Sequence, residues 1–409
     1  MNALKKKILN AIVEGRLLSK ILNYIFIVFF LNILRNIIWC FLLIKNIDNK
    51  KIIFITFQGS YTCNPKYITN ELLKENINCK IIWSLSNKKS DDQFAKQIKT
   101  VKINSLSFLK EYANSKIIVM NSIGYYNGYP LPKRKKQIII QTWHGSLGIK
   151  KFTGENIRKH WFNTGIKNGL KTSYCISNSD FEDMVYRTTF WPNSEILKYG
   201  HPRNDILFSS NQYDLNKIKN ELLSKYKINN NPKIILYAPT FRDIRNLNCY
   251  NLDYIKLLDA VKKRFRNENW VILLKFHESE KILSKILTIN NVIDVSDYPD
   301  IQELISITDI AITDYSSWIY DFMLMEKPGF IYASDINDYN TERGFYYSLE
   351  STPFPIASDN DQLYDNIINF NEKHYHEKRK IFLKEKGCID DGNASKRVVN
   401  KIKELIGDL

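Results

Sequence analysis

The chain has 409 residues, 44% of them hydrophobic and 25% charged, and 59 Lys and Arg residues face 43 Asp and Glu residues. This composition excludes a disordered, collagen-like or low-complexity chain, and the length allows two domains with cores of their own. The net charge of +16 indicates an anionic partner, such as a phosphorylated substrate, an anionic membrane surface or nucleic acid. The alternative is a basic solvated surface without a specific partner.

Residues 1–48 are predicted to be a membrane-associating helical segment. The stretch 21–44 is apolar apart from four residues, and lysines flank it on both sides. We expect it to lie in the membrane interface on the cytoplasmic side, with Tyr24 and Trp39 near the headgroups and the lysines on lipid phosphates. A single spanning helix is a second possibility, although it would place Arg35 inside the bilayer at roughly 2.5–3.5 kcal/mol. A buried pair of helices is the third, and a cleaved signal peptide is not expected.

From residue 51 onward, apolar runs typical of strands alternate with helical patterns. The first series of expected strands comprises Lys51–Phe57, Lys80–Leu85, Lys116–Met120, Ile138–Trp143 and Tyr174–Ser177. The helices expected between and after them are Tyr67–Asn76, Ser105–Asn114 and Phe181–Phe190.

A second series follows the polar connector Ser209–Asn211. Its expected strands are Lys233–Tyr237, Trp270–Phe276, Asn291–Val295, Asp309–Thr313 and Pro328–Tyr332. Its expected helices are Leu215–Tyr226, Tyr254–Arg266, Ile301–Ile307 and Trp318–Met325, with a charged helical end at Gln362–Asp408. Two such series predict an α/β fold of two doubly wound Rossmann-type domains facing a cleft. We place their boundaries at 49–208 and 209–409, with the C-terminal helices in the second domain.

One histidine stands at the predicted tip of a buried strand. His144 follows the run 138–143 and precedes a small basic loop that contains Gly145, Ser146, Lys150 and Lys151. Ligands bind at such strand ends in open α/β sheets, and histidine transfers protons near neutral pH. We interpret His144 as a residue that lies close to a ligand and is able to transfer a proton; the alternative is a core histidine bonded to the backbone.

A second group of polar residues suits a phosphate. Lys275 and His277 alternate with Phe276 at the end of another strand, so both point to one side of it. Ser316 and Ser317 stand at a helix start, where free N–H groups and the helix dipole favour anions. A solvent-exposed His277 and simple helix capping by Asp314 or Ser316 are the alternatives.

Two further loops follow strands of the predicted domains. Thr240 and Arg242 lie in the first, where Arg242 is suited to a bidentate phosphate contact or to a surface pair with Asp243. In the turn 200–205, Arg203 and Asp205 are expected to brace a loop, and His201 is expected to be structural.

Several familiar signatures are absent from the sequence. It has no GxGxxG opening the first unit, no P-loop and no HExxH, and Asp309, Asp314 and Asp321 form no DxD pair. The six cysteines are scattered, which predicts reduced structural thiols in a cytosolic setting. We therefore expect no metal site and no required cofactor. Nucleic acid is not an expected partner either, because aromatic and basic residues are not interleaved as in single-strand channels.

These motifs together resemble the CDP-glycerol glycerophosphotransferase family of teichoic acid and capsule synthesis. The resemblance covers roughly residues 51–369 and runs in order through Gln141–Gly145, Gly200–Asp205, Tyr237–Asp243, Lys275–His277, Ile312–Ser317 and Arg343–Tyr346. It implies a GT-B-type fold and transfer of a polyol phosphate from CDP-glycerol or CDP-ribitol to a lipid-linked glycan or teichoic acid acceptor, with release of CMP.

The resemblance also implies roles for particular residues. His144 corresponds to the catalytic base, His277 to a second essential residue near the donor phosphates, and Ser316 and Ser317 to the pyrophosphate-binding loop. Two other functions remain open at this point. One is a GT-B glycosyltransferase that uses a nucleotide sugar for a cell-surface polysaccharide, and the other is a non-enzymatic membrane adaptor with a degenerate site.

Overall fold

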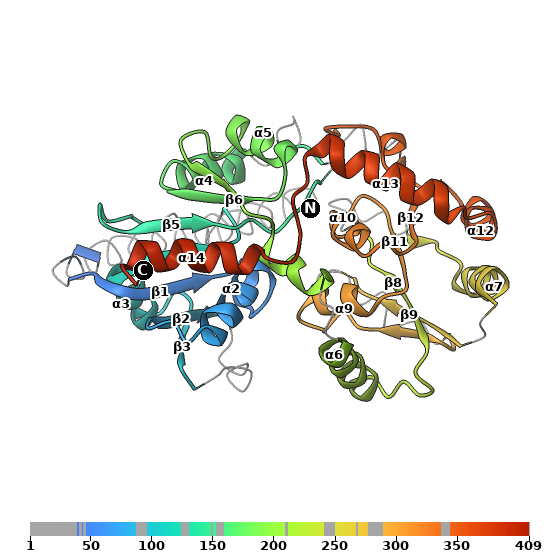
Figure 1. Ribbon diagram of the computed structural model, residues 1–409, viewed down its shortest axis with the longest axis horizontal. Coiled ribbons are helices and arrows are strands. Elements are labelled where there is room, and N and C mark those ends of the chain that lie inside the picture. The colour runs from blue at the N-terminus through green and yellow to red at the C-terminus, as the bar shows by residue number, and fades with distance from the viewer. Residues whose placement is uncertain are drawn as a thin grey trace, which may run out of the picture.

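The protein is described by a computed structural model that covers residues 39–40, 43, 46–86, 96–123, 131–148, 150–152, 159–208, 212–240, 250–266, 269–276, 289–336 and 344–408. Within these ranges the chain forms two parallel β-sheets, flanked by helices and lying side by side (Figure 1). The α/β fold with two doubly wound units, expected from the sequence, is confirmed.

The first sheet has seven strands in the order β3-β2-β1-β4-β5-β6-β7. Its strands are β1 (Asp48–Ile55), β2 (Lys80–Leu85), β3 (Ile98–Lys102), β4 (Ser115–Met120), β5 (Ile138–Gln141), β6 (Tyr174–Ser177) and β7 (Glu195–Lys198). Its helices are α2 (Cys63–Lys74), α3 (Leu106–Asn114), α4 (Lys159–Gly169) and α5 (Asp180–Thr188). Side chains of β1 alternate between the two faces: Ile52 and Phe54 pack with α2, whereas Ile53 and Ile55 pack with α3. Both faces of the sheet are thus buried.

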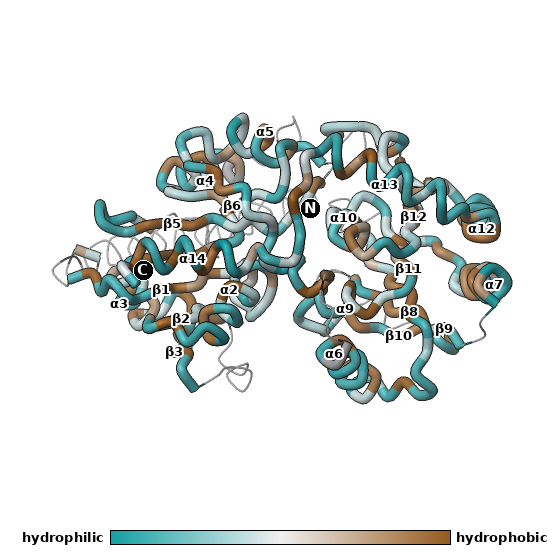
Figure 2. The backbone as a smooth tube through the Cα atoms, viewed as in Figure 1, coloured by the Kyte–Doolittle hydropathy of each residue, from teal (hydrophilic) through white to brown (hydrophobic). Residues whose placement is uncertain are grey.

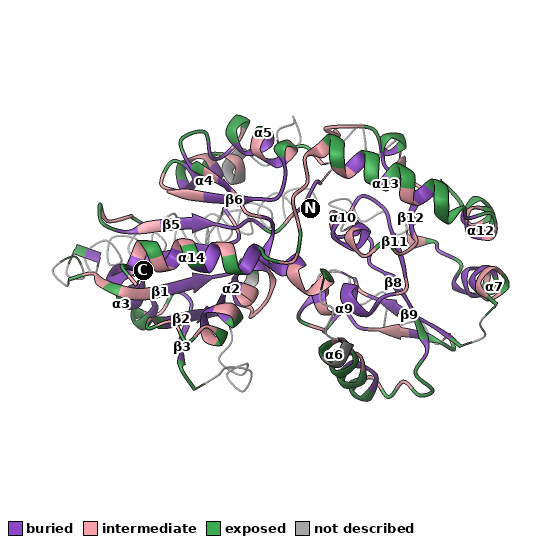
Figure 3. Cartoon of the chain, in the orientation of Figure 1, coloured by how far each residue is buried: buried purple, intermediate pink, exposed green. Residues whose placement is uncertain are grey.

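The second sheet has six strands in the order β10-β9-β8-β11-β12-β13. Its strands are β8 (Lys233–Tyr237), β9 (Trp270–Leu274), β10 (Val292–Asp294), β11 (Ile310–Thr313), β12 (Gly329–Tyr332) and β13 (Ile356–Ala357). Its helices are α6 (Gln212–Lys225), α7 (Tyr254–Phe265), α9 (Ile301–Ile307), α10 (Trp318–Phe322), α12 (Asn360–Ile368) and α13 (Glu372–Lys386). The apolar strands form the interior of each unit, and the outer faces of the helices are hydrophilic and exposed (Figures 2 and 3).

The last helix departs from the expected domain division. Helix α14 (Ala394–Ile406) lies over the first sheet, next to α2, whereas α12 and α13 lie with the second sheet (Figure 1). Val398, Val399, Ile402 and Ile406 join the core cluster that contains β1 and α2. Placing all C-terminal helices in the second domain was therefore wrong for α14, because its apolar stripe completes the first core.

Elements that the sequence did not reveal lie mostly at sheet edges. β3 and β7 are the outermost strands of the first sheet, and both mix charged with apolar residues rather than forming an apolar run. The expected strands at 138–143 and 270–276 end two residues earlier, at Gln141 and Leu274. In both places the residues beyond the strand form the loop that lines the cleft.

Most of the predicted membrane-associating segment, including residues 1–38, lies outside the described residues. Trp39 is described, and it is buried 5.7 Å from the ring of Tyr112 on α3 rather than placed at a membrane surface. Among the helices that the structure describes, none combines the length and apolarity needed to cross a bilayer.

Candidate active site

A pocket opens between the two units where loops from both sheets meet. We call it the cleft pocket; it has a volume of about 450 Å³. The first unit contributes Phe57, Cys63 and His144, and the second contributes Lys275 and Ser317. His144 of the first unit and Lys275 and Ser317 of the second therefore line the same pocket. Ligands bind at such strand ends in open α/β sheets.

A second pocket of about 580 Å³ lies on the other side of His144. We call it the aromatic pocket because its walls include Trp143, Phe152, Phe181, Tyr186, Tyr315 and Tyr346. It shares Phe57, His144 and Ser317 with the cleft pocket. Because these three residues line both spaces, His144 stands at the junction of two binding volumes.

The backbone fixes the tautomer of His144. Its Nδ1 lies 2.5 Å from the carbonyl oxygen of Asn121, which follows β4. A carbonyl oxygen only accepts hydrogen bonds, so Nδ1 carries the proton and Nε2 keeps a lone pair. The ring also stacks on Phe57 with centroids 5.5 Å apart. Among the described residues none is hydrogen-bonded to Nε2, and an oriented imidazole with such a nitrogen is the arrangement that a general base requires.

The surroundings of His144 keep the imidazole neutral. The side chain is exposed to the cleft, but the protein encloses it closely enough that loss of bulk water lowers the pKa of His144 to about 4. The nearby cation of Arg203 also lowers the pKa, whereas the hydrogen bond to Asn121 raises it. His144 is therefore unprotonated across the whole neutral range, which is the state that a general base needs before it takes a proton.

We expect a histidine NMR titration to place the pKa of His144 near 4, well below the ordinary value of about 6.5. The signal is assigned by its absence from the spectrum of His144→Ala. Because the folded protein holds this proton more weakly than the unfolded chain, the contribution of His144 to stability declines as the pH falls from about 6.5 towards 4. A titration midpoint near 6.5 would contradict this account.

The loop that carries His144 is held in an unfavourable backbone conformation. Trp143 has φ 51° and Leu147 has φ 42°, values in the left-handed region that bulky residues rarely adopt. Each such residue destabilises the fold by about 1–3 kcal/mol unless its surroundings compensate. Asn64 Nδ2 donates to the carbonyl oxygens of Thr142 at 2.8 Å and of Trp143 at 3.1 Å.

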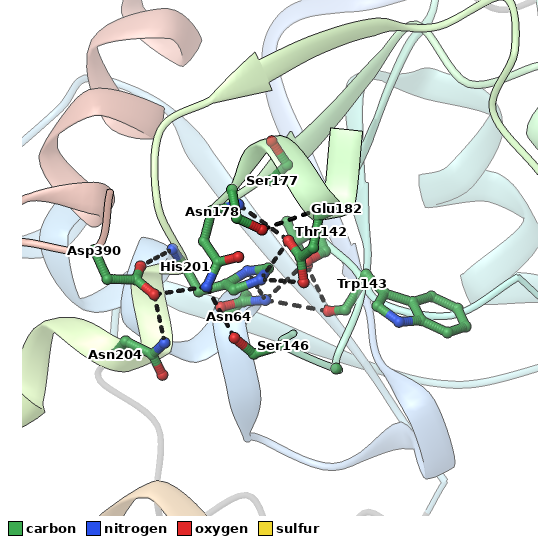
Figure 4. A network of polar contacts seen from close by, with 12 residues as sticks. Asn64, Thr142, Trp143, Ser146, Ser177, Asn178, Glu182, His201, Asn204 and Asp390 are labelled. Carbon is green, nitrogen blue, oxygen red and sulfur yellow. Dashed lines mark hydrogen bonds and ion pairs between the residues drawn. The ribbon is translucent and has the colours of Figure 1, made fainter. Parts of the chain in front are cut away.

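Figure 4 shows the buried network behind this loop. His201 is 0% exposed, its Nε2 lies 2.9 Å from Glu182 Oε2, and its backbone N–H donates to Asp390 at 2.7 Å. Asn178 Nδ2 donates to Ser146 Oγ at 2.8 Å and to Asp390 at 2.7 Å. The prediction that His201 is structural is confirmed, and Ser146 also belongs to this supporting network.

The second unit presents a cation and two hydroxyl groups to the cleft pocket. Lys275 follows β9, and its Nζ donates to the carbonyl oxygen of Tyr298 at 2.6 Å. Ser316 and Ser317 precede α10, and the Ser317 side chain makes no capping hydrogen bond to that helix. The alternative of capping by Asp314 or Ser316 is a separate matter, because the N-cap residue of α10 is Ser317. The Ser317 side chain lines both pockets.

Thr240 and Asp314 support the site from outside the two pockets. The backbone N–H of Thr240 donates to Asp314 Oδ1 at 2.8 Å, and the N–H of Tyr315 donates to the same carboxylate. Asp314 thus fixes two loops of the second unit. Lys150 Nζ donates to Thr240 Oγ1 at 3.3 Å, and Lys150 forms an isolated antiparallel bridge with Phe345. The basic loop of the first unit is therefore tied to the second.

Some site residues lie beyond what the structure describes, and others were missed by sequence reasoning. Arg242 and His277 lie outside the described residues, so their predicted roles stay predictions. Phe57 and Asn121 were not recognised, although they lie two residues after β1 and one residue after β4. Across the described part of the chain, no group of three or more His, Cys, Asp or Glu side chains is arranged to hold a metal ion.

Two Rossmann-type units meet at a cleft that presents a lysine, two serine hydroxyl groups and an imidazole. This arrangement is typical of group transferases that act on phosphorylated donors. The sequence model of the family described as CDP-glycerol:poly(glycerophosphate) glycerophosphotransferase matches residues 37–404. The chain belongs to this family.

Individual relatives agree with the assignment. The chain is 31% identical over 89% of its length to a teichoic acid poly(glycerol phosphate) polymerase of Staphylococcus epidermidis and spans 51% of that protein. It is 31% identical over 88% of its length to the enzyme of the same name from Bacillus spizizenii, of which it spans 93%. It therefore spans about half the length of one relative and nearly all of the other.

A solved structure of the wall teichoic acid polymerase TagF matches at a TM-score of 0.75 and 29% identity. The match covers 91% of this chain and 94% of that one. The GT-B-type arrangement expected from the sequence is confirmed by this match.

Proposed function

We propose that the protein transfers glycerol phosphate from CDP-glycerol to a hydroxyl group of a teichoic acid acceptor. The observation that carries the proposal is the position of His144, with an open Nε2, between a pocket lined by Lys275 and Ser317 and a separate aromatic pocket. A two-substrate phosphotransfer needs a base between two binding volumes. The alternative use of a nucleotide sugar is compatible with the fold, but the two curated relatives described above are named for glycerol phosphate.

The reaction follows from this placement. The acceptor oxygen attacks the β-phosphorus of the donor, and its proton passes to Nε2 of His144. A new bond forms between that oxygen and phosphorus while the bond from phosphorus to the bridging pyrophosphate oxygen breaks, releasing CMP. Lys275, Ser316 and Ser317 meet the charge that develops on the departing phosphate. Arg242 and His277, which lie outside the described residues, are proposed for the same role on the sequence alone. Fixed positive and hydrogen-bonding groups of this kind supply most of phosphoryl-transfer catalysis.

The donor is assigned from the relatives and from the chemistry of the cleft pocket. A variant of TagF, solved after a soak with CDPG, matches this chain at a TM-score of 0.74. Relatives named for ribitol phosphate match at 28–32% identity, so CDP-ribitol is the second candidate donor. We place the donor site in the second unit and the acceptor site in the first.

The acceptor would approach through the aromatic pocket. It lies beside His144, adjacent to the cleft pocket, and Lys150 and Lys151 stand in its wall together with Gly145 and Ser146. Two lysines suit the phosphates of a growing teichoic acid chain or of a lipid-linked glycan.

A donor panel tests the proposal. The purified protein is incubated with an acceptor and, separately, with CDP-glycerol, CDP-ribitol and a set of UDP- and GDP-sugars, and the released nucleotide is measured. We expect CMP from CDP-glycerol in excess of every other release. Turnover of UDP- or GDP-sugars alone would overturn the proposal in favour of a glycosyltransferase, and no turnover of any donor would favour an adaptor.

We further propose that the part of the predicted segment before the buried Trp39, residues 1–38, attaches the protein to the cytoplasmic face of the cell membrane. The lysines and apolar run of this segment support an in-plane anchor on anionic lipid. Deleting residues 1–38 should move the protein from the membrane to the soluble fraction of a cell lysate while leaving Trp39 in place in the first core. Unchanged membrane association of the truncated protein would show that another surface anchors it.

A further inference from the structure

The loop that follows His144 and the turn that carries Ser317 come from different units and lie almost in contact in the wall of the aromatic pocket. A Cβ atom built on Gly148 would lie 3.4 Å from Ser317 Cβ, and one built on Gly145 would lie 3.8 Å from Ser317 Oγ. The loop of the proposed base and the loop of the proposed phosphate site are thus separated by little more than a van der Waals contact. A side chain that holds both loops would set the geometry of the reaction.

Arg203 is such a side chain. It lies in the 3-10 helix Pro202–Phe208 that connects the two units, and it is 3% exposed. Its Nη2 donates to the carbonyl oxygen of Gly145 at 2.9 Å, and its Nε donates to Asp321 Oδ2 at 2.9 Å. Because the guanidinium group is planar and rigid, these two hydrogen bonds fix the spacing of the groups that accept them.

Asp321 connects Arg203 to the turn that contains Ser316 and Ser317. It lies on α10, which begins immediately after Ser317, and it is 2% exposed. Asn204 Nδ2 donates to Asp321 Oδ1 at 3.0 Å, and Gln302 Nε2 in turn donates to Asn204 Oδ1 at 2.8 Å. Because its carboxylate accepts three hydrogen bonds from Arg203 and Asn204, Asp321 anchors the first turn of the helix that follows the serines.

We propose that Arg203 and Asp321 are positioning residues that hold the loop of His144 at a fixed distance from the Ser316–Ser317 turn. The inference rests on the proposed function, because it assigns these two residues to the alignment of the acceptor with the donor phosphate. Neither residue takes part in the transfer itself; they keep the reacting groups within attack distance. Alignment of this kind is sensitive, since a displacement of about 1 Å can slow a reaction about 100-fold.

The matched variants are Arg203→Lys and Arg379→Lys. Arg379 is also buried, at 5% exposed, and pairs with Glu326, but it lies on α13 away from both pockets. In both variants lysine keeps the positive charge but lacks the planar guanidinium group, which donates to two acceptors at once. We expect kcat of Arg203→Lys to fall about 10- to 100-fold while KM for CDP-glycerol changes less than about threefold. Arg379→Lys should lose stability without losing kcat.

Two results would overturn the inference while leaving the proposed function intact. An unchanged kcat in Arg203→Lys would show that the spacing does not depend on Arg203. A raised KM with unchanged kcat would make Arg203 a direct donor contact, which its place in the wall of the cleft pocket allows. Combining Arg203→Lys with Asp321→Asn should slow the reaction no more than the worse single change, because both act through one contact.

Hydrogen exchange tests the same inference without any substrate. Amides of residues 143–148 and 317–322 should exchange faster in Arg203→Lys than in the unchanged protein, and at the original rate in Arg379→Lys. If the unchanged protein fails to use CDP-glycerol, the proposed function falls, and exchange still decides whether Arg203 joins the loops. Equal exchange of both segments in all three proteins would overturn the inference.

Discussion

Replacing His144 by alanine is expected to lower the rate of glycerol phosphate transfer about 10²- to 10⁴-fold, the usual contribution of a positioned general base. The imidazole is neutral, its Nδ1 is committed to Asn121, and Nε2 remains to take the acceptor proton. Affinity for CDP-glycerol should stay within a few fold, because Lys275 and Ser317 remain in place. Steady-state rates and donor binding by calorimetry measure the two quantities separately.

His374→Ala is the matched control for this variant. His374 is exposed on α13 and lines neither pocket, so its loss should leave the rate of transfer unchanged. Full activity in His144→Ala would remove His144 as the base. An equal loss in both variants would point to damage of the fold rather than of the site.

Replacing Lys275 by methionine is expected to weaken CDP-glycerol binding roughly 10- to 150-fold, which corresponds to about 1.5–3 kcal/mol for a hydrogen bond to a charged group. Methionine keeps the unbranched stem, so the change removes the charge and the donor with little loss of packing. The ammonium group also holds the Tyr298 carbonyl, and that part of the cleft wall should loosen with it. Calorimetric titration with CDP-glycerol measures the effect.

Lys233→Met controls for the general loss of positive charge. Lys233 begins β8, the neighbour of β9 in the same sheet, and pairs with Asp309 at the end of the strands far from the cleft. Donor affinity of Lys233→Met should equal that of the unchanged protein. Similar weakening in both lysine variants would indicate a diffuse charge effect and contradict a specific contact at Lys275.

The parts of the fold that the sequence predicts are those in which one local signal suffices. Strands such as β6 and β8 are buried on both faces, so a continuous apolar run reveals them. Edge strands such as β3 are partly exposed to solvent, and their charged residues interrupt the apolar run by which a strand is recognised in the sequence. Helix α14 falls within the stretch Gln362–Asp408 that was expected to be helical. Its packing on the first sheet depends on which apolar surface the rest of that unit leaves uncovered, and no local pattern encodes that.

The same limit applies to the site. His144 and Lys275 could be predicted because each follows an apolar strand in a compact motif. Phe57 lies 87 residues from His144, and a lone aromatic residue after a strand carries no sign that it will stack on an imidazole. The bracing role of Arg203 was expected, but its two acceptors come from different units and become neighbours only after both have folded.

His144, which lines both pockets, is proposed to take the proton of the acceptor hydroxyl as that oxygen attacks the donor phosphate. Mass spectrometry of the acceptor after incubation with CDP-glycerol tests it most directly, run in parallel on the unchanged protein and on His144→Ala. We predict that the acceptor gains glycerol phosphate with the unchanged protein, in step with CMP release, and gains almost none with the variant. An acceptor that remains unmodified by the unchanged protein, or is modified equally by the variant, would contradict the account.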